Sequence, residues 1–70
     1  MSDVIALVNK AIDHIRVQDS CFNAESIAQR SGIAIGMASA FLHVGLIDKE
    51  TYVTLNGNAE FMRSHALKQL

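Results

Sequence analysis

The segment Ala24–Ile47, which reads AESIAQRSGIAIGMASAFLHVGLI, constrains the fold of this chain more than any other. Apolar residues at helical spacing surround two glycines, Gly32 and Gly45. Glycine adopts the left-handed backbone conformation that ends helices and makes tight turns. The segment therefore predicts a helix that ends near residue 30 or 31, a turn at Gly32, and a further helix over about Ile35–Val44 that Gly45 stops.

The flanking regions complete the predicted order of elements. Apolar residues at helical spacing predict a first helix over about Ser2–Val17, and Asn23 is a good N-cap for the second helix. Farther along, β-branched and aromatic residues predict a short β-hairpin between about Leu46 and Leu55, turning at Asp48-Lys49-Glu50. Asn58 then caps a last helix. We expect a single domain over residues 1–70 that is mainly α with a short β-hairpin, in the order helix, helix, turn, helix, hairpin, helix.

The composition of the chain favours a protein that forms a complex with another chain. Half of the 70 residues are hydrophobic, and so short a chain buries only a modest fraction of its surface alone. We therefore expect a homodimer or another complex. The formal net charge of −1 gives no general attraction to nucleic acid, whose phosphates favour basic proteins.

Nothing in the sequence indicates a membrane or secreted protein. The single cysteine, Cys21, cannot form an internal disulfide, so an oxidising compartment is not required. No apolar run approaches the roughly 20 residues of a membrane span, and the N-terminus lacks the pattern of a signal peptide. We expect a soluble cytoplasmic protein without membrane contact.

Metal binding and catalysis find little support in the residue pattern. The soft metal ligands lack the close paired spacing of zinc sites; they are His14, Cys21, His43 and His65. No nucleophile motif, phosphate-binding loop or dinucleotide fingerprint occurs. The sequence therefore predicts a protein that is not an enzyme and that uses no metal or cofactor.

The predicted order of elements resembles the winged helix-turn-helix superfamily over about residues 20–62. The resemblance is carried by a small residue at the helix crossing, the turn glycine four residues later and an apolar plug, within the set Ile27, Ala28, Gly32, Ile33, Phe41 and Leu42. The stretch GLIDKETYVTLNGNAEF resembles the exit from the recognition helix, a short wing and a closing helix. The resemblance implies a DNA-binding transcriptional regulator of bacterial, plasmid or phage type that acts as a dimer.

The same resemblance places the DNA contacts at Arg30, Ile35, Ser39, Ala40, His43 and Lys49. Arg30 and Lys49 are expected near phosphates, while Ser39 and His43 can hydrogen-bond a base edge and Ala40 can touch a thymine methyl. The helix that would read the bases nevertheless carries no Arg, Lys, Asn or Gln, and the expected wing tip is net acidic. Any DNA binding is therefore expected to be weak.

An adapter or inhibitor that binds a protein partner is the alternative function. Gly36 and Ala40 are small and four residues apart, so a helix bearing them lets another backbone come close. The competing interpretation is that these small residues pack the helix inside its own domain. A basic patch around Arg30 and Lys49 favours DNA, whereas an exposed apolar patch around Ile35, Met37 and Ala40 favours a protein partner.

Overall fold

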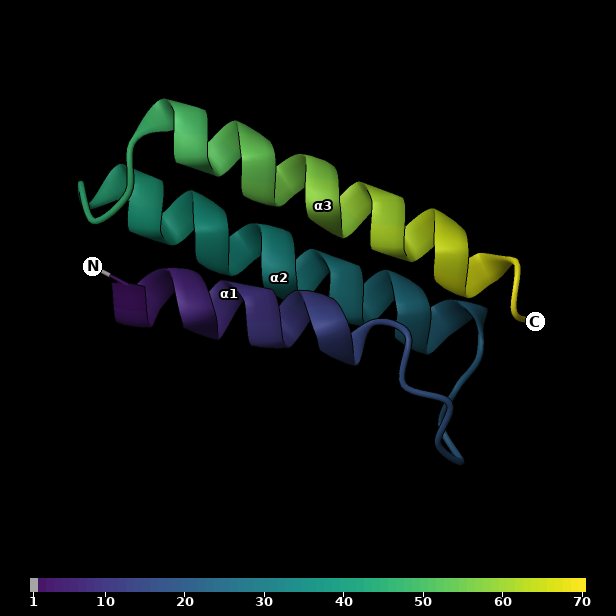
Figure 1. The fold of residues 1–70 in the computed structure, drawn as a ribbon. Coiled ribbons are helices and arrows are strands. Elements are labelled where there is room, and N and C mark those ends of the chain that lie inside the picture. The colour runs from purple at the N-terminus through teal and green to yellow at the C-terminus, as the bar shows by residue number, and fades with distance from the viewer. Residues whose placement is uncertain (1) are drawn as a thin grey trace.

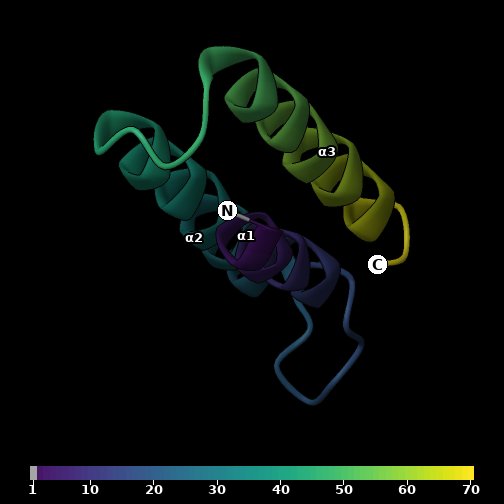
Figure 2. The ribbon, with the colours of Figure 1, turned by 60° about the vertical axis from the view of Figure 1, so that its left-hand side comes forward.

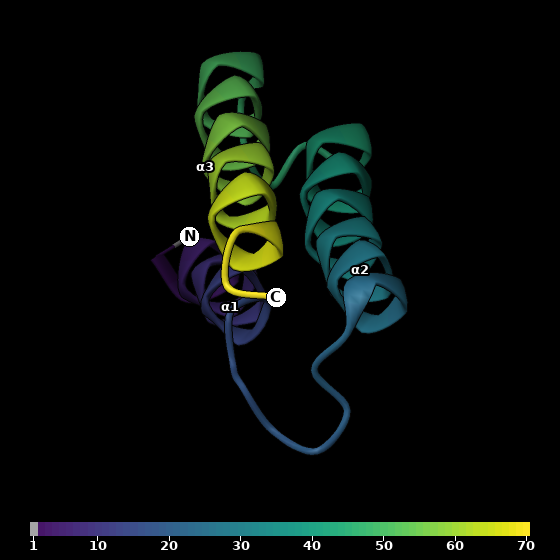
Figure 3. The same ribbon diagram turned by 90° about the vertical axis from the view of Figure 1, so that its right-hand side faces the viewer.

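The computed structural model describes residues 2–70, which form three helices joined by two loops (Figure 1). Helix α1 spans Ser2–His14, α2 spans Ala24–His43 and α3 spans Lys49–Leu67. Successive helices run antiparallel, and viewed almost along their axes they stand at the corners of a triangle (Figure 3). No strand occurs within residues 2–70, so the predicted β-hairpin and the winged-helix architecture are wrong, whereas the mainly α class is confirmed.

Helix α2 continues through Gly32, where the sequence predicted a turn. Its buried residues Ile27, Ser31, Ala34 and Ala38 recur every three or four positions and therefore lie on one side of the helix. This unbroken buried side offsets the roughly 1 kcal/mol that a glycine inside a helix costs relative to alanine. The two short helices predicted on either side of Gly32 are thus one long helix.

Helix α3 occupies the region in which the hairpin was predicted. The carboxylate of Asp48 accepts a hydrogen bond from the Thr51 N–H at 2.8 Å and caps the N-terminus of α3. Leu55 and Ala59 are buried at helical spacing, and this burial outweighs the β propensity of the threonines and valine around them. Asp48-Lys49-Glu50 therefore begins a helix instead of a wing, and Asn58 lies inside α3 instead of capping it.

Both predicted ends of the Ala24–Ile47 segment are confirmed. Asn23 caps α2, and its side chain accepts a hydrogen bond from a backbone N–H of the first turn. Gly45 follows the last turn of α2 with φ of +81°. Its N–H donates to the Leu42 carbonyl at 3.1 Å, and the Leu46 N–H donates to the Phe41 carbonyl at 2.8 Å. This pair of hydrogen bonds ends the helix tightly and leaves a short loop before α3.

Helix α1 ends at His14, three residues earlier than predicted. The chain then makes tighter turn bonds, in which the Ile15 N–H donates to the Ile12 carbonyl at 3.1 Å and the Val17 N–H donates to the His14 carbonyl at 3.2 Å. Residues 16–23 extend away from the end of the bundle before α2 begins (Figure 2). The chain is thus a bundle of three helices, with a long connection between α1 and α2 and a short one between α2 and α3.

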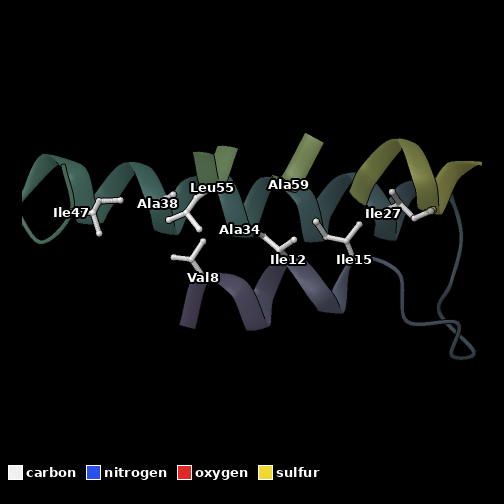
Figure 4. Packing of buried hydrophobic residues seen from close by; sticks show 10 residues of the cluster. Val8, Ile12, Ile15, Ile27, Ala34, Ala38, Ile47, Leu55 and Ala59 are labelled. Carbon is white, nitrogen blue, oxygen red and sulfur yellow. The ribbon is translucent and has the colours of Figure 1, made fainter. Parts of the chain in front are cut away.

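Small side chains fill much of the core. Helix α2 buries Ala34 and Ala38, and α3 buries Ala59 and Ala66, so both long helices contribute small side chains to the core. Larger side chains from α1 and the turn after it point toward the other two helices (Figure 4). Three further large side chains come from α2, α3 and the loop between them. The large members of the core are Val8, Ile12, Ile15, Ile27, Ile47 and Leu55.

The helix-ending role of Gly45 can be tested against a glycine inside a helix. Gly45→Ala is expected to lower the free energy of unfolding by about 1 kcal/mol, because alanine at this positive φ is strained. Gly57→Ala is expected to raise it by about 1 kcal/mol, since Gly57 lies within α3 and an added Cβ meets nothing within 4 Å. Urea unfolding measures both changes, and shifts of the same sign would contradict the assigned conformations.

Candidate functional site

Arg30 joins α2 to the loop that follows α1. Its Nη2 donates to both carboxylate oxygens of Asp19, at 3.0 and 3.1 Å. Its Nη1 donates to the Val17 carbonyl at 2.9 Å and to the His14 carbonyl at 3.3 Å. The guanidinium thus satisfies carbonyls at the C-terminal end of α1, where the helix dipole also favours a positive charge.

The ion pair is partly shielded from water. The Arg30 side chain is 11% exposed, whereas that of Asp19 is 43% exposed. The hydrogen bonds from Arg30 hold the pKa of the Asp19 carboxyl below its ordinary value of 3.8. Arg30 is therefore engaged inside the fold, and a contact with DNA phosphates, which stays a prediction, would compete with its bonds to Asp19.

The other predicted DNA contacts lie on different parts of the bundle. Ser39, Ala40 and His43 are exposed near the C-terminal end of α2. Ile35 is half-buried and packs against the core. Lys49 is exposed at the first position of α3. Ile35 lies one turn before Ser39 on the same side of α2, whereas Arg30 is bonded to the loop after α1 and Lys49 belongs to α3.

The aromatic residues, which the sequence analysis did not single out as surface residues, are all outside the core. The chain has three phenylalanines and one tyrosine. Phe22, Phe41 and Tyr52 are half-buried at the edge of the core, and Phe61 is 72% exposed. Phe61 falls outside the three- and four-residue spacing of the buried α3 residues Leu55, Ala59 and Ala66, so the spacing would have indicated its exposure once α3 was known to be one helix.

Phe61 belongs to an apolar line on the outward side of α3. Val53, Gly57 and Phe61 are four residues apart and exposed, with 59% of Val53 accessible to solvent. We call these three residues the α3 face. The carboxylates of Glu50 and Glu60 lie within one helical turn of it, and the Glu60 carboxylate is 3.9 Å from the Arg63 guanidinium. The α3 face is thus an apolar strip with Glu50 and Glu60 beside it, Glu60 being paired with Arg63, and with Lys49 one turn before Val53.

A hollow of about 380 Å³ opens between α1 and α3, one row of side chains away from the α3 face. Ile5 and Asn9 line it from α1, and Asp48, Glu50 and Asn58 are among the residues that line it from α3 and its N-cap. The hydrogen bond from Thr51 holds the pKa of the Asp48 carboxyl below its ordinary value. A negative charge therefore persists at this hollow at neutral pH.

Comparison with protein-family models, curated proteins and solved structures finds no match to this chain. Within residues 2–70, no cluster of three or more His, Cys, Asp or Glu side chains is arranged to hold a metal ion. None of the helices in that range is both long and apolar enough to cross a membrane. The site must therefore be interpreted from its own geometry.

Removing the Arg30 side chain tests its structural role. Arg30→Ala is expected to lower the free energy of unfolding by about 2 kcal/mol, because it removes a charged hydrogen-bond group at a helix end. Arg30→Lys is expected to recover only part of this loss, since an ammonium lacks the forked geometry of a guanidinium. The matched control is Arg63→Ala, whose exposed pair contributes little. A stable Arg30→Ala variant in urea unfolding would contradict this role.

The pH dependence of stability follows from the lowered pKa of Asp19. A carboxylate with a lowered folded pKa stabilises the fold above its ordinary pKa of 3.8, and this contribution is lost as the pH falls through the folded value. The difference in urea midpoint between the wild-type protein and Asp19→Asn should therefore be largest at neutral pH and disappear in acid. The Asp19→Asn variant still contains Asp48, whose pKa is lowered as well, so the difference between the two proteins reports on Asp19 alone.

Proposed function

We propose that this protein is a small adapter or inhibitor that binds an amphipathic, positively charged segment of another protein through the α3 face. The single observation that carries the proposal is Phe61, whose ring is 72% exposed in a chain with so few aromatic residues. Burial of one such ring against a partner is worth about 2 kcal/mol. This exposed aromatic anchor is typical of a recognition surface.

The charge around the α3 face supports a cationic partner. Asp48, Glu50 and Glu60 outnumber Lys49 and Arg63 around it, and the hollow between α1 and α3 offers two carboxylates. A partner helix with Lys or Arg beside apolar residues would place its apolar side on Val53 and Phe61 and its cations near these acids. Cys21 needs no oxidising compartment, which fits a cytoplasmic place of action.

DNA binding remains a prediction, and fewer features of the structure favour it than of the sequence. The residues predicted to form a wing against the DNA backbone form the N-cap and first turn of α3 instead, where Asp48 and Glu50 flank Lys49. Arg30 is bonded to Asp19 and to two backbone carbonyls. Ser39 and His43 remain exposed, but exposed cations are not gathered beside them on α2. The geometry therefore favours the protein partner.

A library of displayed helical peptides tests the proposed function. Selected peptides should be enriched in Lys or Arg beside apolar residues, and Phe61→Asp should weaken their binding by about tenfold or more. Because Phe61 is exposed, this variant should retain the wild-type helix content. The matched control is Leu7→Asp, which changes an exposed apolar residue on α1 and should leave binding unchanged.

Two outcomes would overturn the proposed function. One is a selection whose peptides bind Phe61→Asp as well as they bind the wild-type protein. The other is tight binding of a mixed-sequence DNA duplex at physiological salt that is lost on His43→Ala or Lys49→Ala. In that case the exposed end of α2 would be the recognition surface.

A further inference from the structure

The outward side of α2 contains two glycines that the packing of the chain itself does not require. Gly32 and Gly36 lie inside α2, and both are exposed. A Cβ added at either position would meet nothing within 4 Å. Alanine would therefore fit at both positions and would favour the helix, since glycine weakens helix interiors. These glycines instead leave the backbone of α2 open to close approach from outside.

One acidic and one imidazole side chain on this side of α2 are placed symmetrically about Ala34. Glu25 precedes Ala34 by nine residues and His43 follows it by nine, so they are separated by 18 residues, or about five helical turns, and point in the same direction. Arg30, the other charged residue of α2, is turned to Asp19 and away from this side. We call the exposed residues Glu25, Gly32, Gly36 and His43 the α2 face.

Such an arrangement is complementary to itself when one copy is reversed. If two α2 helices lie antiparallel about a twofold axis that crosses them near Ala34, Glu25 of each copy lies opposite His43 of the other. Gly32 then lies close to Gly36 of the second copy. The two helix dipoles point in opposite directions, which is the favourable arrangement for neighbouring helices. In a parallel pairing Glu25 would meet Glu25. In the reversed pairing the Glu25 carboxylate can accept an N–H of the His43 imidazole, so the pattern favours a second copy of the chain in that direction.

We infer that the α2 face binds a second copy of this chain in an antiparallel, twofold-symmetric dimer. Ile33, which is 60% exposed, flanks the centre of the face and adds apolar contact near the axis. Two helix faces bury less than the about 1,200 Å² of a stable specific interface, so the dissociation constant is expected in the micromolar range. The dimer leaves the α3 face outward and does not depend on the proposed function.

Sedimentation equilibrium with charge-exchanged variants tests the dimer and its geometry. The wild-type protein should dimerise at micromolar concentration. Glu25→Lys and His43→Glu should each weaken dimerisation by about tenfold, whereas the double variant should restore it, because the opposite charges meet again in reversed order. Far-UV circular dichroism of each variant confirms that the helices are retained.

Glycine substitutions provide an independent test of the dimer, with a matched control. Gly36→Leu should abolish dimerisation by holding the two backbones apart. Gly57→Leu adds the same side chain at an exposed glycine of α3 that also has open space, and it should leave dimerisation unchanged. A wild-type protein that stays monomeric to millimolar concentration, a dimer insensitive to Gly36→Leu, or failure of the double charge variant to restore the dimer would each overturn the inference.

Discussion

Close packing of α2 against α3 through small side chains is the constraint on which the rest of the structure depends. Ala34 and Ala38 on one helix and Ala59 and Ala66 on the other are buried, and these two helices share the most extensive contact in the bundle. The fully buried side chains of the core are aliphatic. Phe22, Phe41 and Tyr52 pack at its edge, and Phe61 lies outside it, on the surface on which the proposed function depends.

Helix ends are predictable from this sequence where a side chain or a glycine acts locally. Asn23 caps α2 and Gly45 ends it, because both depend on hydrogen bonds to residues within one turn. Gly32 was misinterpreted because an exposed glycine inside a helix and a glycine in a turn look alike in a sequence. The decisive information was the continuity of the buried side of α2, which includes a polar residue, Ser31, whose hydroxyl donates to the Ile27 carbonyl at 2.7 Å.

The predicted hairpin failed for a related reason. The residues Thr51–Leu55 have local β propensity, but their place in the bundle is decided by contacts with residues far away along the chain. The same limit applies to the candidate sites. Arg30 and Asp19 come from different elements and meet only in the fold, so a cation that seemed available for phosphate is a structural group. By contrast, the small residues Gly36 and Ala40 marked α2 as a helix that another backbone can approach, and they are exposed.

The two loops also give the bundle an internal hierarchy of stability. Helices α2 and α3 share the most extensive contact and are joined by a short connection that Gly45 and Asp48 close at both ends. Helix α1 is joined through a longer loop, and the polar link nearest its end is the Arg30 cluster. Because α1 shares less contact with either of the other helices than they share with each other, it is the element expected to open first when that cluster is lost. Local opening of this protein would therefore begin at α1 and expose Val8, Ile12 and Ile15 before the rest of the chain unfolds.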